Sequence, residues 1–187
     1  MRRQPVYLLL DTSGSMSGEP IEAVRRGVKT LLAELRSDPC AIEAVYLSVI
    51  TFDSTASQVA PLRDLMNFIE PTISAFDATS ASDATSLGAA LSLLMNCVEN
   101  EVIKSSPTQK GDFKPIVFLL TDGQPTDQWE NAADQVKQKK ISNIIAFAAG
   151  LGADSSSLKR ITDFVIDLNK LPPDSLKPLL CTMFYKA

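Results

Sequence analysis

The 187-residue chain is predicted to adopt an α/β fold: a doubly wound, mostly parallel sheet with one antiparallel edge strand and helices on both faces. Two observations predict this fold class. Short, continuous apolar runs recur along the chain, as in strands that are buried on both faces of a sheet. Between them lie segments in which apolar residues return every three or four positions, which is typical of helices with one buried face. No linker divides this alternation, so we expect a single domain over residues 1–187.

The first predicted strand covers residues 6–10, and it ends abruptly in a loop rich in serine and glycine at residues 11–18. A helix is predicted after this loop, because Pro20 suits the first turn of a helix. The apolar residues that follow share one helical face: Ile21, Val24, Val28, Leu31, Leu32 and Leu35. The opening unit is therefore a strand, a polar loop and a helix.

Two further strands are predicted at residues 45–52 and 57–62. The connection between them is so short that it allows only an antiparallel hairpin, which makes the second of the two an edge strand. A stretch of small polar residues without periodicity then leads to another helical stripe over residues 87–102. Thr85 and Ser86 are residue types that cap a helix at this position.

The second half of the chain continues the same alternation. Strands are predicted at residues 116–120, 144–149 and 164–168, and helices at residues 129–140, 154–161 and 173–185. Each of the first two of these strands is followed by a polar or glycine-rich loop, as expected for the repeating units of a parallel sheet.

The composition excludes several classes of function. Lys and Arg total 18 against 22 Asp and Glu, so the chain has a formal charge of −4 and offers no bulk positive field to nucleic acid. It contains no histidine, which removes Ser-His-Asp and Cys-His nucleophile pairs and imidazole metal sites. We therefore expect neither nucleic-acid binding nor histidine-based catalysis.

The cysteines and the first apolar run predict the location of the protein. Cys40, Cys97 and Cys181 are odd in number and lack CxxC spacing, which fits reduced thiols better than a disulfide framework or a zinc cluster. The apolar run at residues 6–10 is too short for a signal peptide or for the ~20 residues of a membrane span. We expect a cytoplasmic protein that does not insert into a membrane.

Oxygen-bearing side chains follow the predicted strands. Asp11, Ser13 and Ser15 alternate in the loop after the first strand, Thr85 precedes a helix, and Asp122 follows a later strand. Ligands of doubly wound sheets bind beyond the carboxyl ends of the strands, so we expect Asp11 to lie in a solvent-facing loop there. Two carboxylates and three hydroxyls suit Mg²⁺, Mn²⁺ or Ca²⁺ rather than zinc or copper. The sequence therefore predicts a divalent metal site, with magnesium as the first choice.

The charge balance of such a site predicts one more ligand. Asp11 and Asp122 would formally neutralise a divalent ion, and a carboxylate that reaches the ion through water leaves it with attraction for another anion. An open coordination position would then accept an Asp or Glu side chain from a protein partner.

The segments Asp11-Thr12-Ser13-Gly14-Ser15, Ala84-Thr85-Ser86-Leu87-Gly88 and Thr121-Asp122-Gly123 contain all five of these residues. Together they resemble the von Willebrand factor A domain and its metal-ion-dependent adhesion site, and the resemblance covers nearly the whole chain. It implies that Ser13, Ser15 and Thr85 are hydroxyl ligands of the metal. It also implies that Asp11 and Asp122 bind the metal directly or through water.

Three further segments, residues 2–11, 47–53 and 110–115, resemble the A domains of bacterial tellurium-resistance proteins. This resemblance implies a role in tellurite resistance or in another chemical stress response. Such A domains occur beside a protein kinase and a PP2C-type phosphatase, which the resemblance suggests as partners.

Three classes of function follow from these patterns. The first hypothesis is a metal-dependent protein–protein interaction module without enzymatic activity. The alternative is a Mg-dependent phosphohydrolase of the haloacid-dehalogenase type with Asp11 as its nucleophile. That family needs a second aspartate two positions later as acid and base, and Ser13 stands there instead. A structural scaffold that binds no metal is the third possibility.

Some residues near the predicted site have two interpretations. Thr79 lies in a duplicate of the tetrapeptide that contains Thr85, but Thr85 is the one that leads directly into a helix. Trp129 either borders the metal face or is half-buried packing, which is the commoner role of a single tryptophan on a helix. Asp127 either shapes the specificity of the site or caps the helix that follows it, which is the simpler role.

Overall fold

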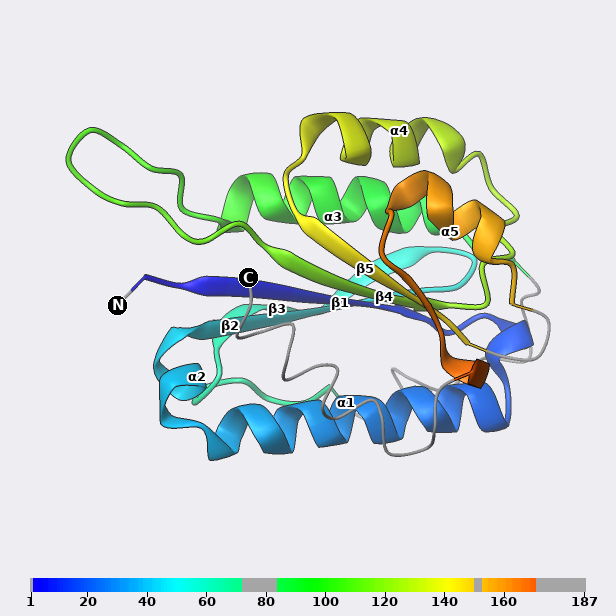
Figure 1. The fold of residues 1–187 in the computed structure, drawn as a ribbon, viewed down its shortest axis with the longest axis horizontal. Coiled ribbons are helices and arrows are strands. Elements are labelled where there is room, and N and C mark those ends of the chain that lie inside the picture. Colours follow the sequence, from blue (N-terminus) through cyan, green and yellow to red (C-terminus); the bar gives the residue numbers. More distant parts are fainter. Residues whose placement is uncertain (1, 72–83, 150–152, 171–187) are drawn as a thin grey trace.

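A computed structural model describes residues 2–71, 84–149 and 153–170 of the chain. Its strands are β1 (Gln4–Asp11), β2 (Val45–Phe52), β3 (Ala56–Asp64), β4 (Ile116–Thr121), β5 (Asn143–Ala148) and β6 (Val165–Asp167). They form one sheet in the order β3-β2-β1-β4-β5-β6 (Figure 1). β3 runs antiparallel to β2, and the other described pairings are parallel. The prediction of a mostly parallel sheet with one antiparallel edge strand is confirmed.

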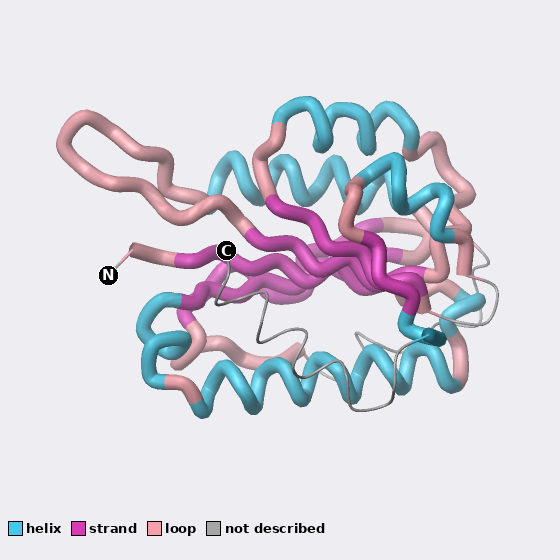
Figure 2. Tube along the Cα trace, in the orientation of Figure 1, coloured by secondary structure: helices cyan, strands magenta, loops and turns pink. Residues whose placement is uncertain are grey.

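The helices lie in two layers, one on each face of the sheet (Figure 1; Figure 2). One layer contains α1 (Glu19–Ser37) and α2 (Pro39–Ala44), and the other contains α3 (Leu87–Glu101), α4 (Glu130–Lys139) and α5 (Ser155–Ile161). Short 3-10 turns cover Gly14–Met16 and Leu168–Lys170. Within the described ranges, no helix has the length and apolar character needed to cross a membrane.

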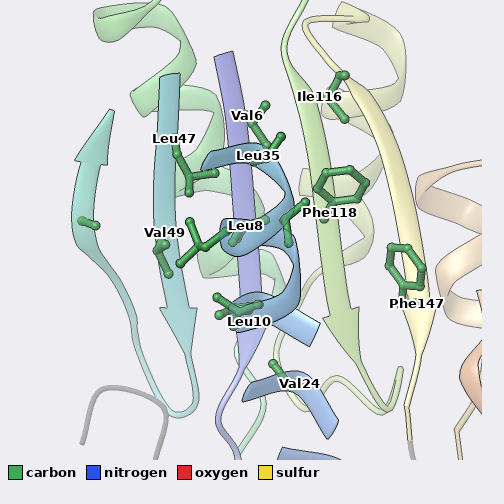
Figure 3. Packing of buried hydrophobic residues seen from close by; sticks show 14 of the residues in the cluster. Val6, Leu8, Leu10, Val24, Leu35, Leu47, Val49, Ile116, Phe118 and Phe147 are labelled. Carbon is green, nitrogen blue, oxygen red and sulfur yellow. The ribbon is translucent and has the colours of Figure 1, made fainter. Parts of the chain in front are cut away.

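Both faces of the central strand β1 are buried, because its side chains alternate between the two helical layers. Val6, Leu8 and Leu10 pack on the side of α1, where Figure 3 shows them with Val24 and Leu35. The intervening residues belong to the core on the other face, which they share with α3: Tyr7 and Leu9 with Leu87, Ala90, Leu91 and Leu94. A strand buried on both faces needs a continuous apolar run, and this explains why residues 6–10 show no alternation.

The carboxyl ends of β1 and β4 form the point at which the connections of the sheet diverge. After β1 the chain continues through α1 on one face, and after β4 it continues through α4 on the opposite face (Figure 1). Ligands of open α/β sheets bind at the carboxyl edge beside such a topological switch point. The loops after residues 11 and 121 therefore begin where this architecture places binding sites.

The sequence pattern missed the shortest elements. α2 has six residues, too few to show a periodic stripe. It begins because Pro39 occupies its first turn and the Asp38 side chain accepts a hydrogen bond from the Cys40 amide. The strand predicted at residues 164–168 is reduced to Val165–Asp167. The helix predicted at residues 173–185 lies outside the described residues, as do Thr79 and Cys181.

Candidate metal centre

The loop after β1 brings the side chains of Asp11, Ser13 and Ser15 together. The Oδ1 atom of Asp11 accepts hydrogen bonds from the backbone amide (2.9 Å) and from the hydroxyl (2.6 Å) of Ser13. The hydroxyl oxygens of Ser13 and Ser15 are 3.1 Å apart. The 3-10 turn closes the loop, because the Met16 amide donates to the Ser13 carbonyl and the Met16 side chain is buried in the core. Three alternate residues thus meet at the carboxyl end of the central strand.

Asp11 is fully buried, so the expectation of a solvent-facing residue is wrong. Leu10 pairs with Leu120 in the register of β1 and β4, which brings the next residue of each strand together. The Oδ2 atom of Asp11 accordingly accepts a 2.5 Å hydrogen bond from the hydroxyl of Thr121. Burial raises the pKa of Asp11 to about 6; hydrogen bonds from Ser13 and Thr121 oppose this rise, and the charge of Asp122 adds to it.

Asp122 is held by the tight turn that follows β4. Its Oδ1 atom accepts a hydrogen bond from the Gln124 amide (3.1 Å), and its carbonyl accepts one from the Asp154 amide (2.7 Å). Gly123 has a φ of +74°, and a Cβ atom there would lie 2.2 Å from the Asp154 carbonyl oxygen, so the turn requires glycine. Among the described residues, neither Asp11 nor Asp122 has an ion-pair partner. Two nearly buried carboxylates therefore approach each other without a compensating cation from the described chain.

Thr85 is positioned by the same loop after β4. Its amide donates to the Thr126 hydroxyl (2.9 Å), and its carbonyl accepts from the Thr126 amide (3.0 Å). The amide of Ser86 donates to the carbonyl of Asp53, just after β2 (2.7 Å). Thr85 is only 2% exposed, and its hydroxyl has no hydrogen-bond partner among the described residues. These bonds hold Thr85 at the carboxyl edge of the sheet, where Asp11 and Asp122 also lie.

Asp127 caps α3 rather than the helix that follows it, which corrects the sequence-based expectation. Its two carboxylate oxygens accept hydrogen bonds from the amides of Gly88 and Ala89, each 3.1 Å long. Ser86 occupies the N-cap position of α3, but its hydroxyl bonds to the Ser54 carbonyl instead of the helix. The capping of α3 by its own preceding residues is therefore not observed, and the loop after β4 supplies the cap.

Trp129 packs rather than bordering the metal residues. It is partly buried against the core beneath α3 and α4, and the Arg160 guanidinium lies 5.9 Å from the centre of its ring. A Cβ atom on Gly88 would lie 2.8 Å from the Trp129 Cα atom, so the start of α3 and this loop are in close contact. The structure thus favours the packing interpretation of this tryptophan.

The donor set fits a hard divalent cation. Both carboxylate oxygens of Asp11 already accept hydrogen bonds, whereas the Ser13 hydroxyl donates to Asp11 and, even when it accepts from Ser15, keeps one lone pair free. The hydroxyls are therefore the donors that are free to bind, and the carboxylates of Asp11 and Asp122 supply the charge. In the described part of the chain, no three His, Cys, Asp or Glu side chains gather to form another type of metal site.

The same geometry argues against a nucleophilic Asp11. A nucleophilic carboxylate must present an oxygen to its substrate, but Asp11 is fully buried with both oxygens engaged by Ser13 and Thr121. The position two residues later holds a hydroxyl, which does not act as a general acid or base at neutral pH. The site is therefore a poor match to a phosphohydrolase.

Sequence reasoning missed two residues that build the site. Thr121 was noted as a neighbour of Asp122, but its hydrogen bond to Asp11 depends on the register of β1 and β4. Thr126 bonds to Thr85 across 41 positions of sequence, and its residue type alone carries no signal of that pairing. For Thr121, the available clue was the alternating direction of side chains along the strand that ends there. For Thr126, the sequence held no clue.

The chain belongs to the von Willebrand factor type A domain family, whose family model matches residues 6–165. Domains of this family are typically non-enzymatic modules for protein–protein interaction. An uncharacterised protein of Synechocystis is 32% identical over 125 residues, which is 66% of this chain. The chain spans 26% of the length of that relative.

Solved structures from distant organisms share the fold. Proximal thread matrix protein 1 of the mussel byssus has a TM-score of 0.67 and 20% identity, covering 97% of this chain and 47% of its own. An aerotolerance-related membrane protein of Bacteroides fragilis has a TM-score of 0.68 and 16% identity, and the match covers 98% of this chain and 100% of that protein's chain. Manganese-loaded TRAP protein of Plasmodium vivax has a TM-score of 0.65 and 19% identity, and the match covers 96% of this chain and 72% of that protein's chain. A further structure of the mussel protein is described with a zinc-occupied MIDAS motif.

Proposed function

We propose that this protein is a metal-dependent interaction module that binds a protein partner through an Asp or Glu of that partner. The observation that carries the proposal is the convergence of the Ser13 and Ser15 hydroxyls, 3.1 Å apart, beside the buried carboxylate of Asp11. Asp122 and Thr85 complete the proposed ligand set. The family of the chain, whose members typically mediate protein–protein interactions, supports the same function.

The proposed cofactor is a divalent cation, with Mg²⁺ first and Mn²⁺ or Ca²⁺ as alternatives. All five proposed donors are oxygen atoms, as these hard ions prefer. Related folds described as manganese-loaded and as zinc-occupied support a divalent ion in general. When bound, the ion would supply the positive charge that attracts a partner carboxylate.

The residues of the chain have separate tasks in this function. Ser13, Ser15 and Thr85 would be direct, neutral ligands, and Asp11 and Asp122 would balance the charge of the ion. Asp11 also holds the Ser13 hydroxyl through its 2.6 Å hydrogen bond, so that the hydroxyl has one orientation. Neutral ligands leave the ion attractive to one more anion, and this is the role assigned to the partner.

We also propose that the protein acts in bacterial tellurite resistance or a related chemical stress response. The support is the resemblance of residues 2–11, 47–53 and 110–115 to the tellurium-resistance protein TerY. A protein kinase or a PP2C-type phosphatase of the same system is the proposed partner. A cytoplasmic location is proposed with it, because Cys40 and Cys97 are free thiols, as a reducing compartment maintains them.

Metal binding is tested first, by calorimetric titration of Mg²⁺ and Mn²⁺ into the metal-free protein. Ser15 is exposed, so Ser15→Ala removes one proposed ligand without disturbing the core, and we expect at least about tenfold weaker binding. Glu43→Gln on α2 is the matched control, because Glu43 is exposed and distant from the loop after β1. Equal affinity in the two variants would reject the ligand assignment.

Partner binding is tested by titrating the purified kinase and phosphatase against the protein with Mg²⁺ and with EDTA. We expect binding in Mg²⁺, loss of binding in EDTA, and the same loss when one Asp or Glu of the partner is replaced. Identical dissociation constants in the two buffers would reject the metal-dependent mechanism, even if the metal itself binds.

A further inference from the structure

The loop between α3 and β4, residues 102–115, projects from the amino ends of the strands, at the opposite edge of the sheet from the candidate metal centre (Figure 1). The base of this loop is fixed by the start of the chain. Arg3 forms two hydrogen bonds with the Asp112 carboxylate (2.8 and 2.5 Å), and the Phe113 amide donates to the Arg3 carbonyl (2.9 Å). The projecting segment is thus anchored on the central strand.

Arg2 also holds the same loop in place. Its guanidinium donates to the carbonyls of Gly111 (2.7 Å) and Asp112 (2.9 Å) and lies 4.2 Å from the centre of the Phe113 ring. The two sides of the loop are also joined, because the Asp112 amide donates to the Ile103 carbonyl (2.9 Å). A surface that is ordered in advance loses less conformational entropy when it binds a partner.

Exposed basic residues gather around this loop. Lys104, Lys110 and Lys114 belong to the loop itself, and Lys139 and Lys140 lie where α4 ends beside it. The end of α4 adjoins the loop because the following strand is bonded to its base, from the Asn143 amide to the Pro115 carbonyl (2.7 Å). We call Arg2, Lys104, Lys110, Lys114, Lys139 and Lys140 the amino-end basic surface.

The acidic residues nearby do little to neutralise this surface. Asp112 is paired with Arg3, and Glu101 keeps its charge but is directed toward β1 and β3 by the hydrogen bonds that it accepts from Tyr7 and Gln58. Among the described residues, the remaining acidic contact of this surface is Glu99, 3.9 Å from the Lys104 ammonium, and both side chains are largely exposed. An exposed pair at this distance is mostly screened by water, so it leaves the positive potential of the surface largely intact.

We propose that the amino-end basic surface binds an acidic segment of a protein partner, separately from the metal centre. Two observations favour a polypeptide over a phosphate backbone or an anionic membrane. Ile103 and Phe113 are each 43% exposed among the lysines and offer apolar contacts to side chains. The whole chain carries a charge of −4, which repels extended polyanions. The same charge acts little on a short segment bound at the projecting loop, because charges farther from it than one Debye length, about 10 Å, are largely screened.

The probe is a fluorescein-labelled peptide of three Glu-Glu-Leu-Ser repeats, with a second peptide in which Gln replaces Glu. Fluorescence anisotropy is measured on the full chain in EDTA at about 0.1 M ionic strength. The EDTA ensures that the metal centre cannot capture the glutamates. The test variant carries Lys104→Gln, Lys110→Gln and Lys114→Gln. The control carries Arg26→Gln, Lys29→Gln and Lys159→Gln, which removes the same charge from exposed positions on α1 and α5.

We expect the wild-type protein and the control variant to bind the acidic peptide with the same affinity, and the loop variant to bind at least about tenfold more weakly. Because the measurement is made in EDTA, peptide binding by the wild-type protein does not depend on the metal centre, which separates this result from the fate of that centre. The proposal is overturned if the two triple variants lose affinity equally, or if the Gln peptide binds as well as the Glu peptide. It is also overturned if a DNA oligonucleotide or phosphatidylserine vesicles bind through these lysines while the acidic peptide does not.

Discussion

Asp11 combines two properties that oppose each other in the metal-free protein. Its carboxylate is fully buried, and the charge of another carboxylate, Asp122, acts on it unfavourably. Burial of an unpaired charge is unfavourable, and the hydrogen bonds from Ser13 and Thr121 offset this cost only in part. A residue that destabilises the folded state, yet is fixed in position by hydrogen bonds, is typical of a functional site rather than a structural one.

Replacement of Asp11 by asparagine should separate function from stability. Asn keeps the shape and can accept from Ser13, while the Thr121 hydroxyl can turn to accept from the new amide. We expect at least about tenfold weaker Mn²⁺ binding by calorimetry, with a melting temperature in EDTA equal to or above that of the wild-type protein. Asp163→Asn, at an exposed position, should change neither quantity. Unchanged Mn²⁺ affinity in D11N would contradict the assignment.

Thr85→Ala should weaken Mg²⁺ binding by about tenfold, which corresponds to ~1.4 kcal/mol. The reason is that the Thr85 hydroxyl has no partner among the described residues and is held at the carboxyl edge by Thr126. Thr79→Ala is the matched control, because Thr79 occupies the same position in a second copy of the tetrapeptide Asp-Ala-Thr-Ser. Calorimetric titration of Mg²⁺ into the two variants decides which threonine is the ligand. A larger loss of Mg²⁺ affinity in T79A would show that the ligand is Thr79.

Residue types were enough to propose the five candidate ligands, but not to predict how their side chains are held. The spacing of Asp11, Ser13 and Ser15 was readable because all three lie in one loop. The bond from Thr121 to Asp11 and the burial of Asp11 depend on strand pairing, which no local pattern records. The sequence therefore predicted which side chains gather at the edge of the sheet, and the pairing of β1 with β4 determined their surroundings.

At the scale of elements, the start of α3 joins the two halves of the candidate site. Asp127 accepts hydrogen bonds from the first amides of α3, while Thr126 bonds to Thr85 just before the helix. A carboxylate at a helix N-terminus also interacts favourably with the helix dipole. The loop that carries Asp122 and the helix that follows Thr85 are thus tied together, so a shift of one would be transmitted to the other.

Two helical glycines should respond to alanine in opposite directions. In Gly88→Ala the new Cβ atom would meet the Trp129 Cα atom at 2.8 Å, so we expect a loss of ~1–3 kcal/mol in the free energy of unfolding. In Gly27→Ala, on α1, nothing lies within 4 Å of the new atom, so we expect a gain of ~0.4–1 kcal/mol. Urea denaturation measures both values. Stabilisation by G88A would show that α3 does not pack tightly against the loop after β4.

The longer elements were predictable because burial imposes a period on the sequence. The stripe from Ile21 to Leu35 is buried on α1 as expected, and the hairpin of β2 and β3 follows from its short connection. The cap of α3 was not predictable, because Asp127 lies 39 positions beyond the amide of Gly88. Contacts between distant segments leave no periodic trace, so elements were predicted better than the bonds between them.

At the scale of the whole molecule, a divalent ion should stabilise the fold. Asp11 and Asp122 lack a cationic partner among the described residues, and an ion that binds the folded chain alone adds its binding free energy to stability. At one hundred times its dissociation constant, Mg²⁺ should contribute ~2.7 kcal/mol and raise the melting temperature by roughly 5–10 °C. Scanning calorimetry with MgCl₂, and with KCl at equal ionic strength, measures this effect. S15A, whose binding is expected to be at least about tenfold weaker, should lose about half of this stabilisation or more. An equal rise in KCl would exclude specific binding.

The hydrogen bond from Thr121 to Asp11 joins positions 110 residues apart in the chain. During synthesis, β1 emerges first and pairs with β2, but its other edge waits until β4 has been made. Closing so long a segment costs entropy, so this pairing forms more slowly than a local contact does. The proposed ligands on β1 and after β4 therefore meet only when the middle of the sheet is complete. A newly made chain that binds metal has already paired β1 with β4, so the cofactor would select chains whose central strands are paired and leave the others without it.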